Sequence, residues 1–184
     1  MYHGTTAEAA RGIHADGFLR PRGLTEGNWA YGLFGGNPSN PDLVYVANNV
    51  KTAIEYAKQI CGGQKTSKAA VVSAIPDWKS AVPDEDVVFN LLNNKGTGIL
   101  TEKVWEAYAY AFGFAGTQEA KQDWENQSDK AEISDSGLAE RMKETALRLQ
   151  RVLSENDLES LTRDVGTVAF SKPLRVVDVM YFKA

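Results

Sequence analysis

The chain contains little cysteine and histidine, and these shortages exclude several kinds of site. Its 184 residues include one cysteine, Cys61, and two histidines, His3 and His14. A single cysteine forms no intramolecular disulfide and no multi-cysteine zinc or iron–sulfur centre. A two-histidine catalytic metal site would need both histidines, and the chain has no His-Glu-x-x-His helix motif. We therefore expect a reducing compartment and no metal cofactor.

Long hydrophobic runs are also missing. No segment approaches the roughly 20 consecutive apolar residues of a membrane-spanning helix, and residues 1–6 contain no basic leader followed by an apolar run. These features predict a cytoplasmic protein with no membrane partner. The motifs Gly-x-Gly-x-x-Gly and Gly-x-x-x-x-Gly-Lys-[Ser/Thr] are absent too, which disfavours Rossmann-type dinucleotide binding and P-loop nucleotide binding.

The overall composition is that of an ordinary folded domain. Apolar residues make up 43% of the chain and charged residues 24%, with a net charge of -4. Acidic residues gather in the segment 101–164, which holds 14 Asp and Glu against 8 Lys and Arg. Such a segment is typical of a solvated helical surface, and it does not resemble a nucleic-acid-binding stripe. We expect one domain, 1–184, that contains this helical segment.

Capping and turn signals divide the chain into short elements. Thr5 or Thr6 is suited to cap a first helix, which Gly17 would end, and Asn48 or Asn49 is suited to cap a second. The region 20–42 is rich in glycine, proline and asparagine and is expected to be a long loop. The sequence predicts strands at Met1–His3, Leu43–Ala47, Ala69–Ile75, Thr167–Phe170 and Leu174–Phe182, and helices at Ala7–Asp16, at 50–61, at Thr101–Phe114 and at Leu138–Leu153.

The order of these elements favours an α+β fold over regular βαβ winding. Strands and helices alternate at first, then helices follow one another, and two strands close the chain. The helical segment of about 101–164 is therefore expected as an insertion before the last two strands.

Two places hold residues that packing alone does not require. His3 stands at the end of the first predicted strand, and Gly4 beside it leaves the backbone open for close approach by a ligand. Tyr45 lies in a predicted strand, and Tyr56 follows 11 residues later on the next helix. Taken separately, a histidine in a turn and two core tyrosines are ordinary features.

Together these residues resemble the ADP-ribosyltransferase superfamily, most closely its diphtheria-toxin and poly(ADP-ribose) polymerase branch. That branch has a strand reading aromatic-His-Gly-[Ser/Thr], a helix leading to Gly-[Phe/Leu], a strand reading Tyr-x-Ala, and a second tyrosine 11 positions later. The resemblance implies a split mixed β-sheet with flanking helices and a helical insertion before the last two strands. The matching residues here are Tyr2-His3-Gly4-Thr5, Gly17-Phe18, Tyr45-Val46-Ala47 and Tyr56.

The resemblance also implies a reaction and a cofactor site. NAD would be the co-substrate, and ADP-ribose would pass to a macromolecular acceptor, a protein rather than nucleic acid, as in a bacterial or phage effector or toxin. His3 would hydrogen-bond the adenosine ribose, and the backbone of Gly4 would pair with the nicotinamide carboxamide, with Thr5 in the same cofactor-binding set. Tyr45 and Tyr56 would sandwich the nicotinamide ring by stacking and cation–π attraction.

A carboxylate should complete the catalytic set with His3 and Tyr45, because it would stabilise the charge that develops on the ribose as nicotinamide leaves. In the family this glutamate begins a late strand, and the matching stretch 165–170 has no acid. We favour Glu85, within Pro83-Asp84-Glu85-Asp86, since three adjacent carboxylates in a loop repel one another and have no evident structural purpose. Glu159 and Asp164 are the alternatives.

Two other functions stay open at this point. An NAD-dependent RNA 2′-phosphotransferase would need arginines near His3 and Tyr45 for the RNA phosphates, and only Arg11, Arg20 and Arg22 are near in sequence. A catalytically silent module of the same fold would instead use its cleft, or its acidic helical half, to occupy a partner. NAD hydrolysis distinguishes these possibilities.

Overall fold

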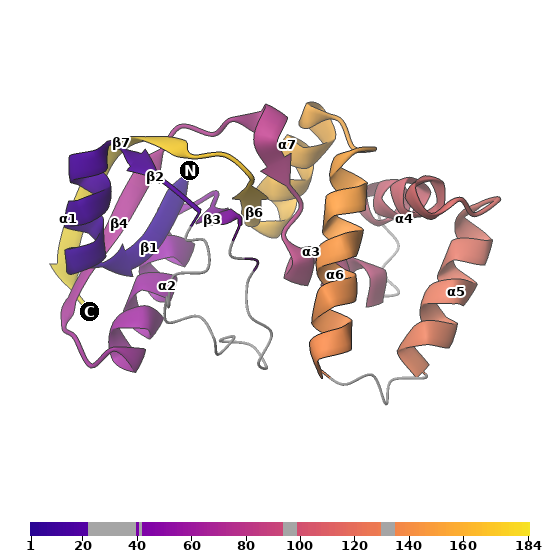
Figure 1. Ribbon diagram of the computed structural model, residues 1–184, viewed down its shortest axis with the longest axis horizontal. Helices are drawn as coiled ribbons and strands as arrows, with labels where there is room; N and C mark the ends of the chain where they lie inside the picture. The colour runs from indigo at the N-terminus through magenta and orange to yellow at the C-terminus, as the bar shows by residue number, and fades with distance from the viewer. Residues whose placement is uncertain (22–39, 41, 94–98, 130–134) are drawn as a thin grey trace. The chain divides into compact units, whose positions relative to one another are not determined.

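The computed structural model describes the chain in five stretches, and it has the α+β architecture that the sequence predicts (Figure 1). Seven strands, seven α-helices and one 3₁₀ turn are present among the described residues. The predicted loop of residues 20–42 lies mostly outside them. The described residues are 1–21, 40, 42–93, 99–129 and 135–184.

Two compact units make up the chain, and each is described by itself. The expectation of a single domain over 1–184 stays a prediction. Unit one comprises residues 1–25, 41–81 and 162–184, and unit two comprises residues 26–40 and 82–161.

Unit one is built on a β-sheet with the strand order β2-β7-β4-β1-β3-β6-β5. The insertion of helices before the last two strands is confirmed, since five helices separate β5 from β6 in the sequence. The strands are β1 (Tyr2–Thr6), β2 (Phe18–Leu19), β3 (Val44–Ala47), β4 (Lys68–Ala74), β5 (Ala81–Val82), β6 (Thr167–Phe170) and β7 (Leu174–Lys183).

The expectation of a mixed sheet is wrong for the pairings whose register is defined, because all of them are antiparallel. The reason lies in the position of β1. Strands β3 and β4 point the same way and are joined through a helix, but β1 runs between them and opposite to both. If β3 and β4 were neighbours, they would form a parallel pair. Because β1 lies between them, each of them forms an antiparallel pair with β1 instead.

Helices α1 (Ala7–Asp16) and α2 (Val50–Gly63) cover opposite faces of this sheet. Successive side chains of a strand point to opposite faces, and β4 shows this directly. Ala70 and Val72 pack with Ala10 of α1, whereas Val71 packs with Ala53 of α2. Because β4 is apolar on both faces, it forms the centre of the unit's core.

The predicted caps are confirmed. Thr6 accepts a hydrogen bond from the amide of Ala9 and begins α1, and Gly17 ends it with φ of 76°. Asn49 begins α2 by accepting from the amide of Thr52. Strand β1, however, continues through Thr6 instead of stopping at His3, because β4 pairs with it along its whole length.

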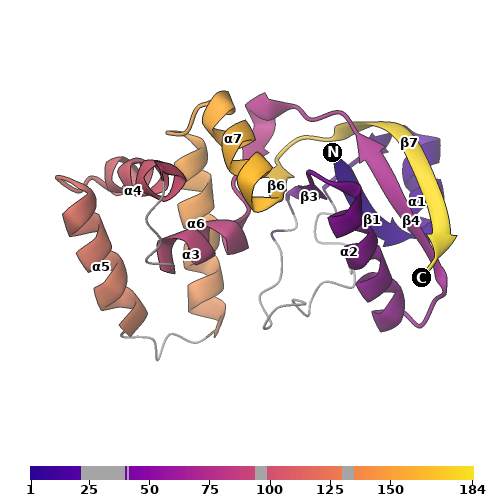
Figure 2. The ribbon, with the colours of Figure 1, turned by 180° about the vertical axis from the view of Figure 1, so that it is seen from behind.

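Unit two is helical (Figure 2). Tyr108 is its aromatic centre, stacking on Phe112 and meeting Trp124 edge-on, and the Trp124 indole donates to Asn93. The predictions for α4 and α6 are confirmed within a few residues, whereas α3, α5 and α7 are absent from the predictions. The helices are α3 (Glu85–Asn93), α4 (Ile99–Phe112), α5 (Thr117–Asp129), α6 (Asp135–Gln150) and α7 (Glu155–Val165), whose last turn belongs to unit one.

Candidate functional site

The sheet of unit one separates between β1 and β3. Strand β1 pairs with β4 at five register positions, and β3 pairs with β6 at four. Between β1 and β3 the register holds a single pair, Tyr2 with Ala47. Each of the two strands is therefore held firmly on its outer side, while the two diverge from one another after one residue. We call the place where this register ends the split, and the motif residues His3 and Tyr45 lie on the two strands beside it. The split sheet that the resemblance implies stays a prediction.

His3 joins the two diverging strands. Its Nδ1 lies 2.9 Å from the carbonyl oxygen of Tyr45. A carbonyl oxygen can only accept a hydrogen bond, so Nδ1 carries the proton, and in the neutral ring Nε2 is the acceptor. Continuing the register from Tyr2 and Ala47 would place Gly4 opposite Tyr45. In a regular antiparallel ladder the carbonyl of Tyr45 would accept a hydrogen bond from the backbone amide of Gly4. Here it accepts from the imidazole of His3 instead.

The backbone of Gly4 points into this split. Met1 and Ala74 exchange two hydrogen bonds of 2.9 Å, so Met1, His3 and Thr5 turn their amides and carbonyls toward β4. By the same alternation Tyr2 and Gly4 turn theirs toward β3. Within the described residues the β1–β3 register ends at Tyr2. The amide and carbonyl of Gly4 therefore face the split as an adjacent donor and acceptor.

Packing gives Gly4 a second role that the sequence analysis missed. A Cβ at this position would lie 2.0 Å from the carbonyl oxygen of Ala53 and 2.7 Å from the amide nitrogen of Ala57, both on α2. Such distances are far inside van der Waals contact. Glycine is thus required for α2 to approach the sheet, and access for a ligand is not the main reason for it.

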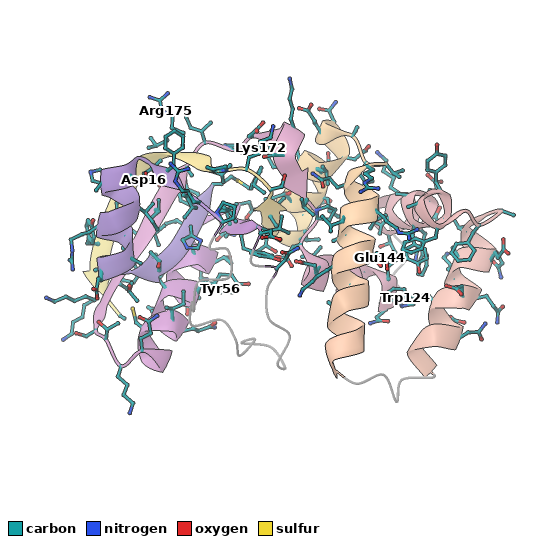
Figure 3. All side chains as sticks on the ribbon, in the orientation of Figure 1. Asp16, Tyr56, Trp124, Glu144, Lys172 and Arg175 are labelled. Carbon is teal, nitrogen blue, oxygen red and sulfur yellow. The ribbon has the colours of Figure 1, made fainter. Side chains whose placement is uncertain are left out.

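Tyr45 and Tyr56 belong to the same side of the sheet. Tyr45 shares a face of β3 with Ala47, which packs with Ala53 of α2. Tyr56 projects from α2 itself (Figure 3). Both side chains are partly exposed, while Val44 and Val46 beside Tyr45 are buried. The two tyrosines thus share a side of the sheet, and their role as a clamp stays a prediction.

Thr5 lies on the same strand as His3, on the face of β1 away from the tyrosines. It is 1% exposed, and alternation turns its side chain to the α1 face of the sheet. The side chain of His3 turns to the same α1 face, so the structure brings neither side chain to the side that holds the tyrosines, although the His3 ring reaches the backbone of Tyr45. The assignment of Thr5 to the cofactor-binding set stays a prediction, and the buried position gives it a core role.

The three candidate carboxylates divide between the units. Glu85 and Glu159 belong to unit two, and Asp164 belongs to unit one with His3 and the tyrosines. The expected loop around Glu85 is wrong: Glu85 begins α3 and is 8% exposed. Acidic residues at a helix N-terminus are stabilised by the helix dipole, which supplies the structural purpose that the sequence analysis lacked. Asp164 is exposed near the end of α7.

Asn48 is a positioning residue that sequence reasoning did not find. Its side-chain amide donates to the carbonyls of Thr162 and Arg163 at the end of α7, at 2.9 and 3.2 Å, and its backbone amide donates to Gly166 at 2.8 Å. These bonds fasten the α7–β6 turn, and with it the backbone of Asp164, to the end of β3. The signal in the sequence is the pair of consecutive asparagines after a strand. The helix needs only one of them, Asn49, as its N-cap, so the other is available for a different role.

Charge differs sharply between the units. Unit one has 12 Lys and Arg against 7 Asp and Glu, a net charge of +5, and unit two has 8 against 17, a net charge of -9. A positive unit attracts an anionic ligand over a distance.

Among the described residues no group of three or more His, Cys, Asp or Glu is placed to hold a metal ion. None of the helices described has the length and apolar character needed to cross a membrane.

Comparison with protein-family models, with curated proteins and with solved structures found no match for this chain. The resemblance to ADP-ribosyltransferases therefore depends on the motif residues of the sequence.

Proposed function

We propose that the chain is an NAD-dependent mono-ADP-ribosyltransferase that transfers ADP-ribose to a macromolecular acceptor and releases nicotinamide. The observation that carries the proposal is the bond between His3 Nδ1 and the Tyr45 carbonyl at the split between β1 and β3. It joins two residues, 42 positions apart, that the motif assigns to a single cofactor site. The net positive charge of unit one suits the diphosphate of NAD.

Each feature of the split has a matching group on NAD. A carboxamide offers both donors and an acceptor, which complement the adjacent carbonyl and amide of Gly4. The rings of Tyr45 and Tyr56 can stack on the faces of the flat nicotinamide cation. The Nε2 of His3 accepts from a hydroxyl of the adenosine ribose, since the Tyr45 carbonyl keeps the proton on Nδ1. These contacts hold the nicotinamide leaving group at one end of the cofactor and the adenosine ribose at the other.

The reaction breaks the bond between the nicotinamide nitrogen and C1′ of the ribose. The bonding electron pair leaves with nicotinamide, which becomes neutral, and positive charge develops on the ribose. A nucleophilic group of the acceptor attacks C1′ and loses its proton. A carboxylate beside the ribose stabilises this charge most in the transition state. Glu85 is the candidate from the sequence. Asp164 gains support because it lies in unit one, three residues before β6, which pairs with the strand of Tyr45.

A catalytically silent NAD-binding module is the second candidate. One observation favours it, namely that β6 reads Thr-Val-Ala-Phe and contains no acidic residue. Such a module would hold NAD through the same split and leave its glycosidic bond intact.

Incubation with NAD labelled on its adenosine phosphate, together with a cell lysate, tests the proposal. We expect released nicotinamide and label that becomes attached to protein, identified by its loss on protease treatment. Label removed by nuclease instead would correct the acceptor class. Binding of NAD with no release of nicotinamide would establish the silent module, and absence of NAD binding would contradict both. Consumption of 2′-phosphorylated RNA with NAD would identify the RNA 2′-phosphotransferase reaction.

A further inference from the structure

A pocket of about 540 Å³ lies in unit one, where α1 and β4 begin and β7 ends (Figure 1). Its lining includes Ala7 and Arg11 from α1, Lys68 from β4, and Tyr181 and Lys183 from β7. Pockets that bind small molecules typically enclose about 300–1,000 Å³. This one therefore has room for a small organic ligand.

The strand side chains that line this pocket share one face of the sheet. Ala69 packs with Cys61 of α2. Because successive side chains of a strand alternate, Lys68 turns to the other face, which α1 covers. Lys183 is the register partner of Lys68 and lies on the same face, and Tyr181, two residues before Lys183, lies there too. Two lysines and a tyrosine therefore turn toward the helix that carries Arg11.

The positive charges of the pocket are not neutralised. The amide of Ala184 donates to the carbonyl of Ser67, so the adjacent pair of Lys68 and Lys183 is of the non-hydrogen-bonded kind, in which side chains are closest. Like charges directly opposite one another in a sheet are destabilising. Arg11 adds a third charge, and none of the three forms an ion pair with a described carboxylate.

Acidic side chains of the same elements stay out of the pocket. Asp178 of β7 lies on the opposite face, because an odd number of residues separates its position from that of Lys183. Glu8 of α1 is one turn from Arg11 but is not part of the lining. The described lining contains no Asp or Glu at all. An anion in the pocket would therefore meet three cations and no carboxylate of the lining.

We propose that this pocket binds a small phosphate ester that carries an aromatic ring, of the class of nucleoside monophosphates. The guanidinium of Arg11 is suited to bind a phosphate through two parallel hydrogen bonds, and the two lysines add point charges. A phosphate between Lys68 and Lys183 also removes their repulsion. Tyr181 is 49% exposed and offers a flat face on which a base stacks.

The pocket is separate from the split between β1 and β3. His3 pairs with Val72, and Lys68 lies four residues further along β4, a distance of roughly 13 Å along the strand. A nucleoside monophosphate in the pocket therefore does not reach the bond between His3 and Tyr45. The proposal does not depend on NAD or on the transfer reaction.

Calorimetric titration with AMP tests the proposal. The wild type should bind AMP more tightly than inorganic phosphate, which has no ring, and more tightly than adenosine, which has no phosphate. Lys68→Gln and Lys183→Gln should each weaken AMP binding roughly tenfold, because each removes a charged hydrogen bond. Tyr181→Leu should weaken AMP binding by roughly 2- to 12-fold and leave phosphate binding unchanged. All three side chains are exposed, so the variants should keep the wild-type circular dichroism spectrum.

Lys172→Gln is the matched control, because it removes the same charge from unit one at an exposed turn away from the pocket (Figure 3). It should bind AMP like the wild type. An equal loss in Lys172→Gln and Lys68→Gln would show that only net charge matters and would overturn the proposal. Absence of AMP binding at millimolar concentration would overturn it too. AMP binding that is lost in His3→Ala and kept in Lys68→Gln would place the probe at the split, which also contradicts the proposal.

Discussion

The imidazole of His3 donates through Nδ1 to the carbonyl oxygen of Tyr45 at 2.9 Å, across 42 residues of sequence. This contact lies where β1 and β3 separate after a single register pair. It orients the ring and directs its second nitrogen away from the bonded carbonyl. The same contact holds the backbone of Tyr45 at the split. One residue therefore has both a structural bond and a proposed ligand bond.

Replacing His3 with Ala should weaken NAD binding while the protein stays folded. Loss of one hydrogen bond costs about 0.5–1.5 kcal/mol, which corresponds to a roughly 2- to 12-fold loss of affinity. Calorimetric titration with NAD measures this. His14→Ala, at an exposed position on α1, is the matched control and should bind normally. If His3→Ala unfolds and the wild type has no affinity for NAD, His3 is structural only.

Tyr56→Ala removes one side of the proposed clamp. Aromatic stacking contributes about 0.5–1.5 kcal/mol beyond burial of area, so NAD affinity should fall by roughly 2- to 12-fold. Tyr110→Ala changes an exposed tyrosine of unit two and should leave the affinity unchanged. Equal affinity for NAD in the wild type and in a folded Tyr56→Ala protein would count against the clamp.

The catalytic carboxylate can be assigned by three substitutions that remove charge and keep shape. Glu85→Gln, Glu159→Gln and Asp164→Asn should be compared for NAD affinity and for the rate of label transfer. The residue beside the ribose should lose about 10²- to 10³-fold in rate with little change in affinity. Glu85 is the prediction from sequence. Normal transfer by Glu85→Gln together with a loss in Asp164→Asn would move the role into unit one.

Gly4→Ala should destabilise the fold, because its Cβ would lie 2.0 Å from the carbonyl oxygen of Ala53. Overpacking costs typically about 1–3 kcal/mol, and more where backbone cannot move. Gly12→Ala is the control within the same unit. No atom lies within 4 Å of a Cβ there, and Gly12 is inside α1, so alanine should stabilise by about 0.5–1 kcal/mol. Denaturant unfolding of the two variants gives both values.

Unit two should lose stability in acid through Asp157. Its carboxylate binds Lys103 at 2.8 Å and also Ser154 at the start of α7, and these bonds lower the pKa of Asp157. A carboxyl with a lower pKa in the folded state stabilises the fold above its unfolded pKa and loses this contribution as pH falls through the folded value. Asp157→Asn should therefore be destabilising at neutral pH, by an amount that shrinks at low pH. Urea unfolding at several pH values measures the difference, and a constant difference would contradict the assignment.

Helices with polar sequences show where sequence reasoning failed. Among the described side chains of helix α5, those of Ala120 and Trp124 are the buried ones. The sequence of α5 therefore lacks the regularly spaced apolar residues that predict a helix. Helix α7 did carry a local signal, since Ser154 and Asp157 cap it reciprocally. The acidic residues 84–86 predict a loop as readily as a helix start, because helix N-termini attract the same acidic residues that loops do.

Elements whose formation depends on near neighbours followed from the sequence alone. The caps at Thr6, Gly17 and Asn49, and the strands that hold Tyr45 and the end of the chain, were predicted because their hydrogen bonds and apolar patterns lie within a few residues. Only the tertiary structure decided that β1 lies between β3 and β4, that Gly4 must admit α2, and that Asn48 binds the end of α7. These contacts join residues tens of positions apart, and their energy depends on strand order and on the approach of backbones, which no local pattern specifies.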